Sequence, residues 1–306
     1  MQNQKGLVII TLIILSFLLN AKVYSQCSDA GVCTLGSHKH MEEEEVHRNS
    51  SIYIGDRIGY SGKDEDVTFN SIIVSGSFAL SKNINGSFSL PYNMQSGAAG
   101  DFNGIGDLIV GFSYNHPVKK NSSIDFQLGG KFATGDANQS SSFYGTESAP
   151  PIYQSGSGIN YILLGATYNY QEFAVTLGGQ IPLNRSTNEA YQLKTAPDIL
   201  LGLSYTYPAS DKFYFTGEIL TIKRTAESNA IFGAPNNSSD SIGVDLAESD
   251  FLQMNVQATF NYLITKEVGI KLQGAIPLLK RETNYDGTKR AFTVSAGLNY
   301  FFNMNL

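Results

Sequence analysis

Charged residues are scarce in this sequence, although its mean hydropathy is close to zero. Asp, Glu, Lys and Arg make up 16% of the 306 residues, and the mean hydropathy is −0.12. A disordered chain would carry more charge, and a helical membrane protein would be far more apolar. Abundant instead are 30 glycines, 17 tyrosines and 18 phenylalanines, a composition typical of β proteins with many turns.

Long apolar runs are missing except at the N-terminus. Leu7 to Leu19 is apolar but too short to span a bilayer comfortably; Lys5 precedes it, and Val-Tyr-Ser follows at residues 23–25. This pattern predicts a signal peptide over residues 1–25, with a short membrane anchor as the alternative. Cleavage would remove Lys5 and Lys22 and change the formal net charge from −6 to −8. An acidic exported protein is a poor nucleic-acid binder.

The remaining chain has no stretch that could form a membrane helix, so a membrane-embedded form must be a closed β-barrel. From Ser51 onward, apolar and polar residues alternate with a period of two. In the last segment, one face carries Phe292, Val294, Ala296, Leu298, Tyr300 and Phe302. We predict twelve strands, near 51–60, 67–80, 83–94, 104–115, 122–132, 159–170, 173–183, 196–207, 213–222, 251–264, 268–278 and 290–302.

Alternation alone would also fit a soluble β-sandwich, but three features favour an all-β, transmembrane, antiparallel up-and-down barrel. The polar face is mostly Ser, Thr, Gly, Asn and Gln instead of Lys and Glu. Short turns such as 171–172 alternate with long connections, above all 133–158 and 223–250. Aromatic residues gather at the short-turn ends, as in an interfacial girdle: Tyr114, Tyr168, Tyr170, Tyr205, Tyr207, Phe213, Phe215, Tyr262, Tyr300 and Phe302.

The predicted organisation is a signal peptide (1–25), a short periplasmic segment bearing Cys and His (26–47) and an outer-membrane barrel (48–306). Both termini of an even-stranded barrel lie in the periplasm, and the long loops lie outside the cell. The expected partners are outer-membrane lipid, the barrel-insertion machinery during biogenesis and a small-molecule solute. We expect no nucleic acid and no cofactor.

Charged residues on the inward face are the candidate functional residues. By strand parity these are Arg57, Asp107, Asp125, Lys131, Asp198, Glu218 and Lys271. Four acids and three bases nearly balance, so they could pair and fill the interior. They could equally form a polar constriction that selects solutes. One charge contradicts the pattern, because Asp56 shares its parity with lipid-facing isoleucines; a bulge at Gly55 or a position near the rim would explain it.

The segment 26–47 contains both cysteines and three of the four histidines. In an oxidising compartment, Cys27 and Cys33 favour a disulfide that closes a small loop. A soft-metal site of Cys27, Cys33, His38 and His40 is the sharper alternative, although the spacing matches no standard zinc signature. A third possibility is that neither forms.

Histidine is nearly absent from the barrel, which argues against an enzyme. The one barrel histidine is His116, and the topology places it in a periplasmic turn. A Ser/His/Asp arrangement near the outer rim therefore cannot be built.

Three short motifs carry a resemblance to a known group of proteins. They are Gly104-Ile-Gly-Asp-Leu-Ile-Val-Gly-Phe-Ser-Tyr114, the Ile-Pro-Leu strand ends, and the terminal Gly297-Leu-Asn-Tyr-Phe-Phe302. With them the chain resembles outer-membrane transporters of the phenol-degradation meta-pathway type and, more distantly, long-chain fatty acid transporters. The resemblance implies passive uptake of small, often hydrophobic or aromatic compounds. Fatty acid transporters, however, have fourteen strands and a sizeable N-terminal hatch, whereas this sequence predicts about twelve strands and some 22 residues before the barrel.

Two functions remain after this reading. The first is a passive channel or transporter for small solutes. The second is a non-conducting barrel whose long loops act as a receptor, adhesin or structural element.

Overall fold

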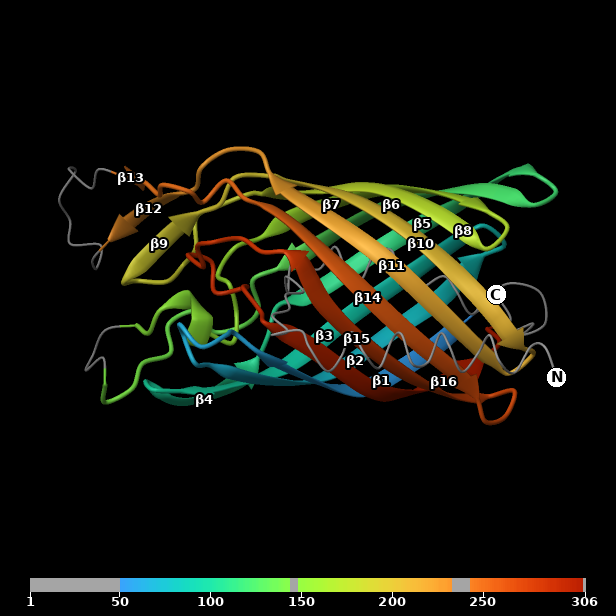
Figure 1. Ribbon diagram of the computed structural model, residues 1–306, viewed down its shortest axis with the longest axis horizontal. Coiled ribbons are helices and arrows are strands. Elements are labelled where there is room, and N and C mark those ends of the chain that lie inside the picture. Colours follow the sequence, from blue (N-terminus) through green and yellow to red (C-terminus); the bar gives the residue numbers. More distant parts are fainter. Residues whose placement is uncertain (1–49, 144–147, 233–242, 305–306) are drawn as a thin grey trace.

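The chain folds into a closed antiparallel β-barrel. The computed structural model describes residues 50–143, 148–232 and 243–304 (Figure 1). The barrel strands are β1 (Ser50–Tyr60), β2 (Thr68–Ser81), β3 (Ile84–Gly97), β4 (Gly100–Ile105), β5 (Leu108–Lys119), β6 (Ser122–Phe132), β7 (Tyr161–Tyr170), β8 (Phe173–Pro182), β10 (Asp198–Ser210), β11 (Phe213–Arg224), β14 (Leu252–Leu263), β15 (Val268–Leu279) and β16 (Phe292–Phe302). Neighbouring strands pair antiparallel, and the β1–β16 and β2–β3 pairings close the ring.

The predicted twelve-stranded barrel is confirmed, because β4 and β5 form one strand with a bulge. Tyr92 of β3 pairs with Ile105, and Ser89 pairs with Ile109. Between these pairs, three residues of β4–β5 face two residues of β3, so the strand gains one residue. The amide of Gly106 still donates to the carbonyl of Pro91 at 2.8 Å, so the wall stays joined at the bulge.

The barrel is apolar outside and polar inside, the reverse of a soluble barrel. On β10, Ile199, Leu201 and Leu203 are 50, 45 and 47% exposed, whereas Asp198 on the other face is 3% exposed. On β14, the inward-facing Gln253 and Asn255 are fully buried. An apolar band on the outer face of a closed barrel is the surface that lipid covers.

Asp56 is the exception on this outer face. The register of β1 with both β2 and β16 is unbroken from Ser51 to Tyr60, so Gly55 forms no bulge. Asp56 is exposed beside Ile54 and Ile58, at the middle of β1. Of the two explanations offered by the sequence, the bulge is therefore wrong, and a rim position does not fit either.

The two ends of the barrel differ in how their strands are connected. Short turns join β2–β3, β5–β6, β7–β8, β10–β11 and β14–β15 at one end, and the long connections lie at the other (Figure 1). Two turns are shorter than predicted, since β5 continues through His116 to Lys119 and β10 continues to Ser210.

The long connections contain structure that the sequence did not indicate. Strands β9 (Tyr191–Lys194), β12 (Asn229–Phe232) and β13 (Val244–Asp245) form a separate three-stranded sheet beyond the barrel. A 3₁₀ turn, η1 (Pro151–Tyr153), lies in the β6–β7 connection. In the described part of the chain, no helix has the length and apolar character needed to cross a membrane.

Candidate functional site

A buried ion pair between β10 and β11 anchors one side of the barrel mouth. Asp198 and Arg224 are direct cross-strand partners. The guanidinium donates from Nε and Nη2 to the two carboxylate oxygens at 2.8 and 3.1 Å. Gln180 of β8, paired with Asp198 on its other side, donates to the same carboxylate at 2.7 Å. This bidentate, fully hydrogen-bonded geometry fixes the orientation of Arg224.

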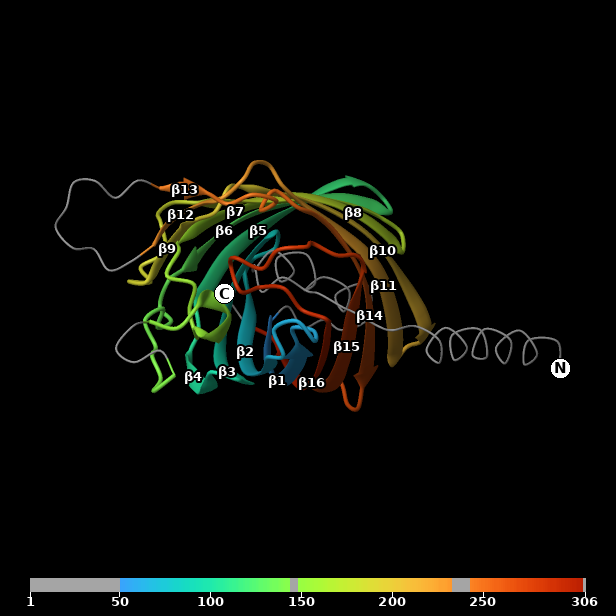
Figure 2. The same cartoon turned by 60° about the vertical axis from the view of Figure 1, so that its left-hand side comes forward.

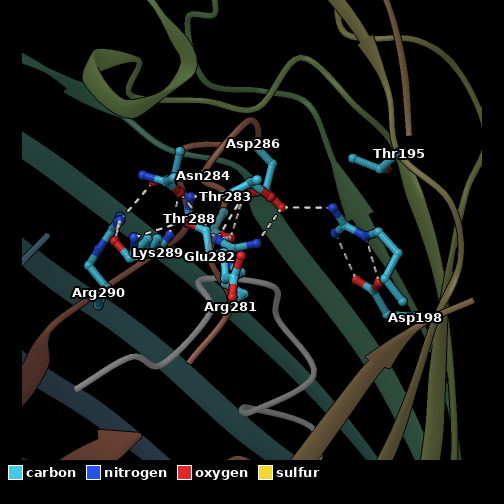
Figure 3. Close-up of polar contacts among 12 residues, drawn as sticks. Thr195, Asp198, Arg281, Glu282, Thr283, Asn284, Asp286, Thr288, Lys289 and Arg290 are labelled. Carbon is cyan, nitrogen blue, oxygen red and sulfur yellow. Dashed lines mark hydrogen bonds and ion pairs between the residues drawn. The ribbon is translucent and has the colours of Figure 1, made fainter. Parts of the chain in front are cut away.

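The connection between β15 and β16, residues 280–291, lies across the mouth (Figure 2); we call it the mouth loop. Its Asp286 reaches the third nitrogen of Arg224, Nη1, at 3.1 Å. The dashed lines in the close-up follow the contacts of Asp286 within the loop and towards the wall that carries Asp198 (Figure 3). Within the loop, Asp286 also contacts Arg281 at 2.8 Å and accepts bonds from the amide and hydroxyl of Thr288. The loop is thereby linked to a strand that is two strands away from its own origin.

The mouth loop packs against the β6–β7 connection and against strand β2, in addition to its contact with β11. Gly287 has a φ of 70°, and a Cβ there would lie 2.5 Å from the backbone of Ile152 in η1. Only glycine fits such a close approach with that backbone conformation. On the opposite side, Arg290 lies over the ring of Phe69, with its guanidinium 3.3 Å from the ring centroid. The loop is thus held from several sides of the mouth.

Phe251 lies between two cations of this cluster. The guanidinium groups of Arg224 and Arg281 each lie 4.7 Å from its ring centroid. Such stacking is favourable for a buried arginine. Beside it is a cavity of about 40 Å³, bordered by Lys131, Gln180, Asp198, Arg224 and Asp286 among others, which is large enough for a few water molecules.

A second ion pair holds the β6–β7 connection. Lys131 lies 3.2 Å from Asp107, which is placed inward by the bulge between β4 and β5. Asp107 also accepts bonds from the amide and hydroxyl of Ser157, at 2.9 and 2.6 Å. The Lys131 ammonium lies 5.4 Å from the ring centroid of its cross-strand neighbour, Tyr161.

The other predicted lumen residues lie deeper. Glu218 is at the middle of β11, opposite Gln257, and Lys271 is on β15 with its ammonium 5.9 Å from the ring centroid of Tyr53. Arg57, on β1, faces inward between Ser71 and Ser295. Asp125 lies nearer the short-turn end, where Asn115 and Asn169 each donate to it at 2.6 Å.

An apolar layer lies inside the barrel beside the mouth cluster. Inward-facing side chains of β7, β10 and β11 pack with residues of the connections: Ile159, Tyr161, Leu163, Leu200, Leu220, Ile222 and Phe251. The alternation in the sequence predicts mostly polar residues on the inward face, so this apolar layer was not predicted. The mouth therefore combines paired charges with an apolar wall.

The structure brings Asp107, Lys131 and Asp198 together at the mouth but leaves Arg57, Asp125, Glu218 and Lys271 elsewhere in the lumen. Arg224 was missed because the predicted strand ended two residues too early; extending its alternation would have found it. The charged runs Lys280-Arg281-Glu282 and Lys289-Arg290 were not singled out from the sequence, and nothing local in them shows where the loop folds. The proposed Cys27, Cys33, His38 and His40 chemistry and the segments 1–25 and 26–47 lie outside the described residues.

The carboxyl groups of the mouth predict loop contacts that resist acid. Burial alone would raise the pKa of Asp286, but the guanidinium groups of Arg281 and Arg224 hold it well below its ordinary value. Its contribution to stability is present above the unfolded pKa of about 4 and is lost only as pH falls towards the depressed folded pKa. Burial raises the pKa of Glu65, which faces this loop, despite Asn284 and the nearby cations. Its protonation is therefore easier in the folded state.

We accordingly expect the mouth loop to stay in place at both pH 7.5 and pH 5.0. Neither carboxyl group weakens its contacts over this interval, because Asp286 stays ionised and protonation of Glu65 favours the folded form. The rate at which a protease cleaves the loop in the same preparation, relative to an unrelated substrate at each pH, measures this. Faster relative cleavage of the loop at pH 5.0 would contradict a stabilising ion pair between Asp286 and Arg224.

No protein-family model and no curated protein sequence matches the chain. Among solved structures, an outer membrane channel from Pseudomonas putida F1 is 16% identical, with a TM-score of 0.59, over 83% of this chain and 94% of that one. The translocator domain of the autotransporter NalP from Neisseria meningitidis is 10% identical, with a TM-score of 0.50, over 89% and 92%. The NanC porin is 10% identical, with a TM-score of 0.46, over 83% and 100%. At these identities the likeness concerns the fold, which is that of an outer-membrane β-barrel.

Proposed function

We propose that this protein is a passive channel of the bacterial outer membrane for small solutes, and that the mouth loop closes it for most, but not all, of the time. The observation that carries the proposal is the way the mouth is closed. The charges there are neutralised between wall and loop, at Arg224 and Asp286, instead of by direct packing of one wall against another. A loop can move without any change in the barrel, so the barrel can remain rigid while its lumen opens.

The nature of the solute follows from the lining. The apolar layer around Leu163 and Leu200 adjoins the paired charges of the mouth, which suits molecules that combine an apolar body with a polar group. The resemblance to transporters of hydrophobic and aromatic compounds points the same way. The barrel-insertion machinery and the outer-membrane lipids would be its partners, and we assign it no catalytic role.

Passage of uncharged solutes into liposomes tests this proposal. We expect vesicles that contain the protein to swell in isotonic solutions of small neutral solutes, with rates that fall as the solute becomes larger. Protein-free vesicles, and vesicles with the heat-unfolded protein, are the controls. Electrical silence together with absent swelling would contradict the channel.

The non-conducting alternative has one structural observation in its favour. The sheet β9–β12–β13 stands beyond the barrel and exposes Phe232 (58%) and Val244 (52%), apolar side chains that could contact a partner. Absence of passage would make this sheet, with the long loops, the working surface.

A further inference from the structure

The mouth holds an arginine whose third nitrogen is bound by a carboxylate from a loop. Asp198 engages Nε and Nη2 of Arg224, and this leaves Nη1 directed at Asp286. The side chain of Arg224 is 5% exposed, and its two bonds to Asp198 orient it from the wall. An oriented, buried guanidinium with one outward-facing nitrogen is a receptor for an oxyanion.

Withdrawal of the loop would break few of the contacts of Asp286. Its bonds to Arg281 and Thr288 are internal to the mouth loop and would leave with it. The contact to Arg224 is the ionic contact that joins Asp286 to the wall. The carboxylate of another molecule can therefore replace that of Asp286 at Arg224 without breaking the contacts that Asp286 makes inside the loop.

The surroundings of Arg224 define the kind of molecule that could take this place. The cavity next to it, which has room for a few water molecules while the loop is in place, would widen on withdrawal of the loop, and the apolar residues Ile159 and Leu193 border it. Phe251 presents an aromatic face beside the guanidinium. A solute with a carboxylate on a compact, flat apolar body would satisfy both the cation and the apolar layer.

We propose that Asp286 is an internal ligand of an oxyanion site on Arg224, and that the carboxylate of a solute displaces it and releases the mouth loop. The inference rests on the proposed channel function and adds a solute class and a mode of opening. A ligand shifts such an equilibrium only by its differential affinity for the two states. A carboxylate has that differential affinity because it binds where Asp286 sits, whereas its neutral amide does not.

Benzoate and benzamide, which have nearly the same shape, test this by single-channel recording at constant ionic strength. In the unaltered protein, benzoate should raise the open probability about tenfold over the same concentration of benzamide, as expected for exchange of one charge-assisted contact. Asp286→Asn should be open without benzoate and should lose the difference between the two probes. Asp250→Asn, which removes an exposed carboxylate paired with Lys223 at 3.1 Å, is the matched control and should behave like the unaltered protein.

A second variant covers the case in which Asp286→Asn fails to fold, which heat-modifiable gel mobility would reveal. Gly287→Ala should loosen the loop against η1 by its steric clash while keeping Asp286, so it should open more often and still respond to benzoate. Equal effects of benzoate and benzamide on the unaltered protein would overturn the inference, as would an Asp286→Asn channel that stays closed. If either result is found but neutral solutes still swell liposomes, only this inference fails. If neutral solutes do not swell them, the channel function fails as well.

Discussion

Replacing Asp198 by alanine should destabilise the barrel by about 3–5 kcal/mol, the usual cost of removing one partner from a buried ion pair. The carboxylate is 3% exposed and accepts three hydrogen bonds, two from Arg224 and one from Gln180. Its removal leaves the guanidinium buried among Phe251 and the apolar layer, with Asp286 as its ionic partner among the described residues. Equilibrium unfolding by guanidinium in lipid vesicles, followed by gel mobility, measures the loss.

The control for Asp198→Ala is a salt bridge at the same end of the barrel. Asp250 and Lys223 are each 44% exposed, so Asp250→Ala should cost no more than about 1 kcal/mol. The double variant Asp198→Leu with Arg224→Met should regain most of the stability, because a buried pair replaced by apolar groups is often close to neutral. Equal losses for Asp198→Ala and Asp250→Ala would show that the buried pair contributes no more than a surface pair.

The charged residues of the mouth show where sequence reasoning succeeds and where it stops. Asp198 and Lys131 were placed inward by parity alone, because the side chains of a strand alternate strictly between its two faces. Arg224 follows the same alternation and was missed only because the predicted strand ended at residue 222 instead of 224. Asp286 obeys no such rule, since its position follows from contacts with a strand more than sixty residues away. Only the tertiary structure joins these two residues.

The same contrast, between a local alternation and tertiary contacts, explains which strands could be predicted from the sequence. All barrel strands were predicted, because lipid outside and polar lumen inside impose alternation over about ten residues. Strands β9, β12 and β13 have four residues or fewer and gain their order from one another and from Leu193, Ala230 and Leu246, which pack together. Such short segments carry too few residues for a periodic pattern.

The polarity of the barrel allows a prediction that separates a membrane barrel from a soluble one. Leu203 lies near the middle of β10, 47% exposed on the outer face, between the equally apolar Val175 and Ile219 of the neighbouring strands. If lipid covers this face, Leu203→Arg should destabilise the folded protein by about 2–4 kcal/mol, the cost of an arginine near the bilayer midplane. In a water-soluble barrel the same change at a half-exposed position should stay within about 0.5 kcal/mol.

The adjacent residue supplies the control for Leu203→Arg. Ser204 points into the lumen directly opposite Glu218, so an arginine there would meet a carboxylate in a polar environment. Ser204→Arg should therefore cost far less than Leu203→Arg, although the two positions differ by one residue and receive the same side chain. Unfolding of both variants in vesicles of one lipid composition measures the difference, and the reverse order of stabilities would mean that the apolar face is not the lipid face.

Asp56 is a charged residue that already lies on the outer, apolar face. Asp56→Leu should therefore stabilise the barrel in vesicles, because it removes the cost of keeping a carboxylate next to lipid. The same unfolding measurement tests this.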